Sequence, residues 1–216
     1  MKKQNRKKFL TAWGLFTAFA VWTALVSLID VQFIGPQGSK VGFATFNKWI
    51  HDAVGVNWWL YSITDWLGLV PIGFCFGFAI LGLIQWIKRR NFLKVDRGIL
   101  VLGGYYIAVM IIYGFFEMVV INYRPVLIDG CLEASYPSST TMLVLCVMPT
   151  AVMQLNARIQ IRKFRRCVSI LISAFVIFMV IGRLLSGVHW ITDIIGGILL
   201  SAGLVRLYVA IINYKR

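Results

Sequence analysis

Six long apolar runs, joined by short polar linkers, constrain this chain more than any other feature of its sequence. They cover approximately residues 9–29, 60–87, 98–121, 141–155, 167–185 and 191–212. A transmembrane helix needs about 20 mostly apolar residues. The chain is 59% apolar, whereas a globular domain has roughly 45–50%. We therefore expect an all-α polytopic membrane protein, a bundle of six transmembrane helices in which residues 1–216 form a single membrane-embedded domain.

The segment between the first two runs has mixed polarity. Within it, FATFNKWIHDAV, residues 43–54, places apolar side chains at helical spacing with polar ones between them. That pattern is typical of a helix that lies in the membrane interface. We expect a short interfacial helix after the first span. The first run itself has no small-x-small cleavage site at its end, so we expect it to be retained.

The formal net charge of +14 predicts topology here. Eighteen of the 22 Lys and Arg residues lie in the N-terminal segment, the linkers 88–97 and 158–166, and the C-terminal part of the chain. The other four are Lys40, Lys48, Arg124 and Arg183. Short loops rich in Lys and Arg stay in the cytoplasm, so we expect both termini to be cytoplasmic. The same excess in a soluble chain would suggest nucleic acid, a partner that we do not expect here.

Ionisable residues near the membrane gather at the opposite, non-cytoplasmic helix ends. One group surrounds the loop after the third span, and the other surrounds the turn between the fifth and sixth spans. A charged residue at membrane depth is energetically costly, so each one is a candidate functional residue. The residues are Glu117, Arg124, Asp129 and Glu133, then Arg183, His189 and Asp193.

His189 and Asp193 are four residues apart, which places them on one face of a helix. We expect a direct hydrogen bond from Nδ1–H of His189 to the Asp193 carboxylate, leaving Nε2 as an outward acceptor. Such an oriented imidazole suits a nucleophile or general base. A purely structural His–Asp pair that holds two helix ends together is equally compatible with the spacing alone.

Anion-binding groups accompany this pair. Arg183 and Arg124 carry planar guanidinium groups suited to phosphate oxygens. Pro125 favours extended backbone at Arg124. The run PSSTT, residues 137–141, has a proline followed by hydroxyl residues, which indicates a helix N-terminus that can bind anions. Together these groups predict an oxyanion site with a nucleophile in it.

These stretches resemble the type-2 phosphatidic acid phosphatase superfamily of membrane lipid phosphate phosphatases. That family carries Lys-x6-Arg-Pro, Pro-Ser-Gly-His and Ser-Arg-x5-His-x3-Asp. This chain has Glu117-x6-Arg124-Pro125, Pro137-Ser138-Ser139-Thr140 and Gly182-Arg183-x5-His189-x3-Asp193. The third motif matches in residue type and spacing, and the six-span layout agrees.

The resemblance implies roles for these residues. His189 would form a phosphohistidine, Asp193 would orient it, and Arg124, Arg183 and Ser138, with Ser139 beside it, would hold the phosphate. The family uses no metal, and we expect no cofactor.

Two positions depart from the pattern. Glu117 replaces a phosphate-binding lysine, and we expect it to pair with one of the arginines. Thr140 replaces the histidine that protonates the leaving oxygen, and a threonine hydroxyl is too weak an acid for that role. His51 is the other histidine of the chain and an accessory candidate for the missing acid; the alternative is a surface residue of no special role.

The expected function is hydrolysis of a lipid phosphate or diphosphate at the outer face of the cytoplasmic membrane. A diphosphate leaves as a phosphate monoester and needs little protonation, so a bacterial polyprenyl carrier such as undecaprenyl diphosphate is the first-choice substrate. Phosphatidic acid and phosphatidylglycerol phosphate remain open. The alternatives are a lipid phosphotransferase of the same fold, an inactive lipid-phosphate-binding relative, and a small anion transporter. A transporter would place charges at mid-bilayer on several helices.

Overall fold

A computed structural model describes residues 2–214, with side chains from residue 5 onward. Eight α-helices make up about three quarters of it. Two single turns of 3₁₀-helix, Pro36–Gly38 and Phe92–Lys94, lie in linkers. The helices are α1 Lys2–Leu28, α2 Ala44–Val54, α3 Trp58–Leu67, α4 Leu69–Arg89, α5 Arg97–Met118, α6 Ser139–Asn156, α7 Arg162–Leu185 and α8 Ile191–Ile212.

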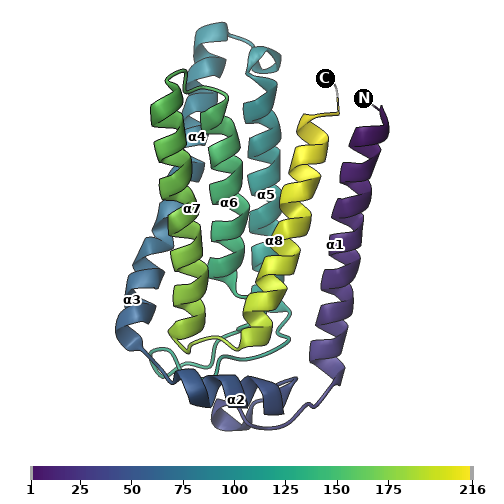
Figure 1. Ribbon diagram of the computed structural model, residues 1–216, viewed down its shortest axis with the longest axis vertical. Helices are drawn as coiled ribbons and strands as arrows, with labels where there is room; N and C mark the ends of the chain where they lie inside the picture. Colours follow the sequence, from purple (N-terminus) through teal and green to yellow (C-terminus); the bar gives the residue numbers. More distant parts are fainter. Residues whose placement is uncertain (1, 215–216) are drawn as a thin grey trace.

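Six helical segments are long and apolar enough to cross a membrane. The all-α, six-span expectation is therefore confirmed. Helices α3 and α4 form one of these spans, Trp58–Arg89, which is interrupted at Gly68. Helix α2 lies across the lower end of the bundle in Figure 1, as the pattern of residues 43–54 predicts.

Helix α6 is the centre of the bundle, because it contacts α4, α5, α7 and α8. Helix α1 packs along α8 on the outside (Figure 1). A core of buried apolar side chains from α4, α5, α6 and α8 fills the interior. Its most buried members are Leu102, Val109, Met142, Cys146, Val147, Ala151 and Tyr208. Most large apolar side chains of α3 and α4 face outward, as in a lipid-exposed span.

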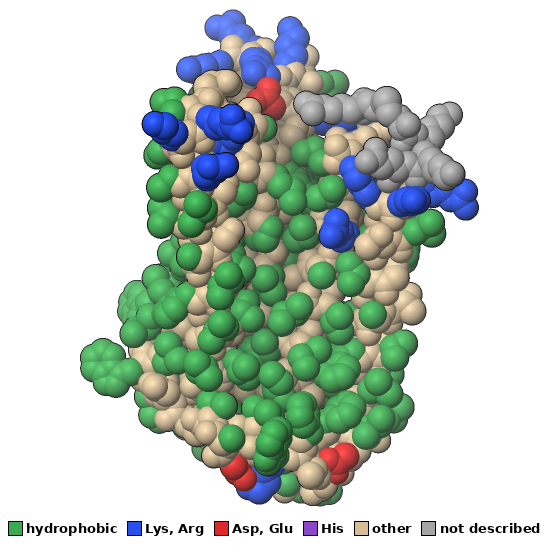
Figure 2. Space-filling view, viewed as in Figure 1, with side chains coloured by type: hydrophobic (Ala, Val, Ile, Leu, Met, Phe, Trp, Pro, Cys, Tyr) green, Lys and Arg blue, Asp and Glu red, His purple; other side chains and the backbone are tan. Residues whose placement is uncertain are grey.

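The two ends of the bundle differ in charge. Figure 2 shows most of the visible Lys and Arg side chains at the end where both termini lie, and an apolar band below them. The linkers α4–α5 and α6–α7 turn at that same end (Figure 1). The loop 119–138 and the turn 186–190 lie at the other end, beside α2. The fold thus collects the polar segments named above at one end.

Candidate active site

The loop between α5 and α6 folds back on itself through backbone hydrogen bonds. The amide of Ser135 donates to the carbonyl of Asn122 at 2.9 Å, and the amide of Arg124 donates to the carbonyl of Glu133 at 3.1 Å. The chain reverses at Gly130, whose φ is +78°. This pairing holds Arg124 and Ser135 against the end of the bundle.

His189 lies in the tight turn between α7 and α8. Gly187 in this turn has φ +69°, and a Cβ atom there would lie 2.0 Å from the carbonyl oxygen of Gly55. The amide of Asn57 also donates to the carbonyl of Ser186 at 3.0 Å. The α2–α3 linker thus presses directly on the turn. His189 is 3% exposed in consequence.

Ser135 joins His189 to Asp193. Its hydroxyl lies 3.0 Å from Nδ1 of His189 and donates to Oδ2 of Asp193 at 2.5 Å. Nδ1 and Oδ2 are 4.0 Å apart, so the expected direct hydrogen bond is not formed. Because the one hydroxyl proton goes to the carboxylate, Nδ1 of His189 carries the proton that Ser135 accepts. Nε2 is therefore unprotonated.

The reason lies in where α8 begins. Trp190 is its N-cap residue, so His189 lies outside the helix and the i, i+4 geometry does not apply. Asp193 instead caps its own helix, since Oδ2 accepts from the Trp190 amide at 2.9 Å. Oδ1 accepts from Nδ2 of Asn122 at 3.3 Å. The fully buried carboxylate is held by three donors.

Arg183 faces the other ring nitrogen. Its NH2 lies 3.2 Å from Nε2 of His189, and its NH1 lies 3.5 Å from Oδ1 of Asp65. The guanidinium carbon is 5.2 Å from the centre of the Tyr61 ring. Arg183 is 1% exposed. A buried cation thus connects the imidazole with a carboxylate of α3.

Arg124 supplies the second guanidinium. Its Nε is 3.0 Å from Oε2 of Glu133, although the N–H bond does not point at that oxygen. Within the described chain, Nε and NH1 of both Arg124 and Arg183 have no hydrogen-bond partner despite their burial. Unsatisfied buried donors are costly. An anion with several oxygens would satisfy them.

The environment of the His189 imidazole favours its neutral form. Burial lowers the pKa of His189 well below its usual range, and the nearby charges of Arg124 and Arg183 lower it further. His189 is therefore neutral at physiological pH. Its Nε2 lone pair faces the guanidinium of Arg183.

The hydroxyl run starts α6, with Ser138 as its N-cap. The Ser138 hydroxyl donates to Oγ1 of Thr141 at 3.0 Å, so it points into the helix. The methyl group of Thr140 lies 3.5 Å from where a Cβ of Gly68 would be, so this side chain faces the α3–α4 junction.

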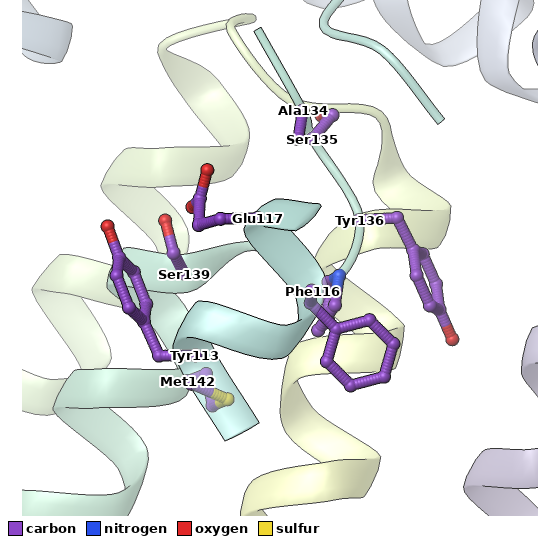
Figure 3. A pocket seen from close by; sticks show the side chains of 9 residues that line it. Tyr113, Phe116, Glu117, Ala134, Ser135, Tyr136, Ser139 and Met142 are labelled. Carbon is purple, nitrogen blue, oxygen red and sulfur yellow. The ribbon is translucent and has the colours of Figure 1, made fainter. Parts of the chain in front are cut away.

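Glu117 does not pair with an arginine, contrary to expectation. The ion-pair partners are Glu133 for Arg124 and Asp65 for Arg183. Glu117 instead lines an enclosed cavity of about 10 Å³, together with Tyr113, Ser135 and Ser139. This volume fits about one water molecule. In Figure 3 the oxygens of Tyr113, Glu117 and Ser139 lie on one side of the cavity.

His51 packs against the same turn from α2. Its ring centre is 5.4 Å from that of Trp190, and its buried Nδ1 has no partner among the described residues. It shares another enclosed cavity of about 10 Å³ with His189 and Gly187. Helix α2 thus brings the second histidine to the edge of the site.

Several residues at this site were not predicted from the sequence. Ser135 and Asn122 have ordinary polar side chains in a polar loop, so they carry no signal of their own. Asp65 and Tyr61 lie at the start of an apolar run. For Asp65 the sequence did carry a signal, because an acidic residue inside a membrane span is a functional candidate.

Comparison with known proteins identifies the family of the chain. Residues 98–216 match the model of the PAP2 superfamily. The chain belongs to the PAP2 superfamily. The family resemblance carried by the three motifs is therefore confirmed. No curated protein matches the chain.

A solved PAP2 structure shares the fold over nearly its whole length. It is the crystal structure of a transmembrane PAP2-type phosphatidylglycerolphosphate phosphatase from Bacillus subtilis. The match covers 95% of this chain and 97% of that one, with 20% sequence identity and a TM-score of 0.62. The chain is thus a multi-pass membrane protein with a PAP2-type phosphatase fold. The PAP2 match begins at Gly98, so α3, with Tyr61 and Asp65, lies outside it.

Proposed function

We propose that this protein is a membrane phosphatase that removes phosphate from a lipid phosphate or diphosphate through a phosphohistidine at His189. One observation carries the proposal. The neutral imidazole presents Nε2 to the buried guanidinium of Arg183 at 3.2 Å, and Nε and NH1 of that guanidinium have no hydrogen-bond partner among the described residues, although NH1 also lies 3.5 Å from Asp65. Nucleophile and phosphate-binding donors thus meet at one place.

The proposed reaction starts when phosphate oxygens bind the free N–H groups of Arg124 and Arg183. This releases Nε2 of His189 to attack phosphorus. The imidazole becomes positively charged as the P–N bond forms, and the P–O bond to the leaving group breaks with its electron pair on the leaving oxygen. The Asp193 carboxylate stabilises that charge through the hydroxyl of Ser135, as a buried carboxylate does in a triad. Water then hydrolyses the phosphohistidine. The N-terminus of α6, with Ser138 and Ser139, is a further phosphate-binding candidate.

Thr140 favours a substrate with a good leaving group. When a lipid diphosphate is cleaved, the leaving group is a phosphate monoester. This group needs less protonation than the alkoxide that leaves from a lipid monophosphate. We therefore propose a polyprenyl diphosphate such as undecaprenyl diphosphate as the first-choice substrate. Topology supports this choice, because 18 of the 22 Lys and Arg residues predict a cytoplasmic face at the other end. The site would then open at the outer face of a bacterial cytoplasmic membrane.

Phosphate release by the purified protein from a panel of lipid phosphates and diphosphates tests the proposal. His189→Ala should abolish release, and Asp193→Asn should reduce it severely. Acid-labile ³²P on the protein after a rapid quench should be lost in His189→Ala. Ser169→Ala is the control, because Ser169 bonds Asn156 and Arg165 instead of the site. Full activity of His189→Ala, or activity that a chelator removes and added metal restores, contradicts this mechanism.

Thr140 also favours a second candidate, an inactive relative that binds lipid phosphate. Such a protein would bind the panel without releasing phosphate from any member. A phosphotransferase of the same fold would label His189 but deliver the phosphate to an alcohol acceptor instead of water. A transporter is disfavoured, because the ionisable groups of the site gather at one end of the bundle.

A further inference from the structure

Asp65 is an acidic residue inside the span Trp58–Arg89. Its side chain is 56% exposed, and its Oδ1 lies 3.5 Å from NH1 of Arg183. A carboxylate at this depth is costly unless it has a partner or a task. Arg183 is its ion-pair partner, and the same guanidinium contacts the nucleophile. Asp65 thus stands at the edge of the site, on the side of α3.

The packing of α3 on α7 fixes this position. Gly182 precedes Arg183, and a Cβ atom at Gly182 would lie 2.8 Å from the Thr64 methyl group. Glycine therefore allows α3 to approach α7 closely. Tyr61, one turn before Asp65, places its ring 5.2 Å from the guanidinium carbon. The two side chains on this face of α3 both meet Arg183.

Thr140 faces the same part of the chain. Its methyl group lies 3.5 Å from the position of a Cβ atom on Gly68. The amide of Gly68 in turn donates to the carbonyl of Asp65 at 3.0 Å. The position that lacks an acid is therefore directed at the helical turn that carries a carboxylate.

We propose that Asp65 transfers the proton to the leaving oxygen, in place of the residue at position 140. This inference rests on the proposed phosphatase function. Asp65 and Nε2 of His189 contact two terminal nitrogens of one guanidinium, so they are at most about 9 Å apart. In-line transfer needs about 3 Å between nucleophile and phosphorus and about 3 Å between acid and leaving oxygen, with one P–O bond between. These three distances together are shorter than the largest possible separation of Asp65 and Nε2, so a substrate phosphate fits between them.

The proton comes from the substrate. A phosphate monoester has its second pKa near 6 and often carries one proton. When it binds Arg183 beside Asp65, its proton moves to the Asp65 carboxylate. As the P–Nε2 bond forms, the P–O bond breaks and the oxygen takes its electron pair and the Asp65 proton.

The second half-reaction restores the starting state. Water attacks phosphorus and gives one proton to the Asp65 carboxylate. The P–Nε2 bond breaks, and its electron pair returns to the imidazole. Asp65 then passes the proton to the departing phosphate, so no outside acid or base is consumed.

The other acidic candidates are placed less well. Glu133 contacts Arg124, which has no direct contact with the imidazole. Glu117 lines a cavity with Ser135 and Ser139, and the ion-pair partners of Arg124 and Arg183 are other carboxylates. His51 packs on Trp190 and shares a cavity with His189, but its Nδ1 has no hydrogen-bond partner among the described residues. Asp65 is the acidic residue that contacts Arg183, whose guanidinium lies beside Nε2 of His189.

The experiment compares two leaving groups with Asp65→Asn. A positioned acid contributes about 10²–10⁴-fold. Turnover of phosphatidic acid, with its alkoxide leaving group, should fall by this factor, whereas 4-nitrophenyl phosphate should lose less than about tenfold. Asp65→Glu should recover part of the alkyl activity. Thr140→His in the Asp65→Asn background should restore it further, because residue 140 faces this turn. The phosphohistidine burst with 4-nitrophenyl phosphate should persist.

Asp52→Asn is the matched control. Asp52 is 58% exposed, pairs with Lys48 and does not contact the site. An equal loss on both substrates in Asp65→Asn would overturn the proposal, because it would show that Asp65 only positions Arg183. Unchanged activity on both would overturn it too. If the unmodified protein forms no phosphohistidine, the proposed function itself fails, and this outcome is separate from the other two.

Discussion

His189 and Asp193 meet through a hydroxyl group. Their nearest nitrogen and oxygen are 4.0 Å apart, and the Ser135 hydroxyl lies within hydrogen-bonding distance of both. The carboxylate therefore controls the imidazole through a residue that comes from the α5–α6 loop. A movement of that loop would change the hydrogen bond of the imidazole.

Removing this hydroxyl should slow the reaction without unfolding the protein. Ser135→Ala leaves Nδ1 of His189 without its partner and Asp193 with one donor fewer. Loss of a hydrogen-bond partner that orients a metal-bound imidazole typically costs about 10–100-fold, and we expect a similar factor for His189. Phosphate release should fall by this factor, and Ser135→Thr should retain more activity. Unchanged turnover in Ser135→Ala would show that the bridge has no role in catalysis.

The depressed pKa of His189 predicts a neutral ring in mild acid. At pH 5.5 an ordinary histidine is mostly protonated, since its pKa is about 6.5. Burial and two arginines lower the pKa of His189 well below that value. The ¹⁵N shifts of the ring, measured in a His51→Gln variant that leaves one histidine, should still report the neutral form. Arg124→Gln should raise this pKa.

The same shift has a consequence for stability. In the unfolded chain His189 takes up a proton near pH 6.5, whereas in the folded protein it does not. Stability from this group is therefore complete above that pH and is lost as the pH falls below it. The melting temperature of both proteins can be measured at pH 6.5 and pH 5.5. A melting temperature that rises on acidification in the wild type, but not in His189→Ala, would contradict the depressed pKa.

Membrane sidedness follows from the charge asymmetry. Cys131 is exposed on the α5–α6 loop, and Asn91 lies in the α4–α5 linker at the opposite end. A variant that keeps only Cys131 should react with an impermeant thiol reagent in intact cells. A variant with Asn91→Cys as its one cysteine should react only after the cells are opened. The reverse pattern would place the site in the cytoplasm.

Two glycines with positive φ should respond differently to alanine. A left-handed conformation costs an alanine about 1–2 kcal/mol. Gly130 has open space around it, whereas a Cβ at Gly187 would meet the Gly55 carbonyl at 2.0 Å. Gly130→Ala should therefore lower stability by about that amount, and Gly187→Ala should lower it more and reduce activity. Equal melting temperatures for the two variants would contradict the contact between Gly187 and Gly55.

The spans were predictable because membrane insertion depends on apolar length, which is visible along the sequence. The contact between His189 and Asp193 was not, because the four-residue spacing assumes one continuous helix. The helix begins at Ile191, so the spacing joined one residue inside the helix to one outside it. Ser135 was invisible for another reason. Its role depends on a residue 54 positions away, and no local pattern encodes that contact.

Asp65 shows the opposite case. Its sequence signal was present, since it is a charged residue within an apolar run. The run was interpreted as one unbroken span, whereas the structure divides it at Gly68 and places α3 against α7. Only the tertiary contact with Arg183 indicates which task the carboxylate has.

The Asn122 side chain has a consequence for biosynthesis. It accepts from the amide of Gly42 at 3.1 Å and donates to the carboxylate of Asp193 at 3.3 Å. The Asp193 carboxylate lies in the last helix. Through Asn122 it is connected to Gly42, which is synthesised early in translation. The site can assemble only after the ribosome has delivered α8 to the bilayer. If the proposed function holds, a partly inserted chain would therefore not hydrolyse the lipids around it.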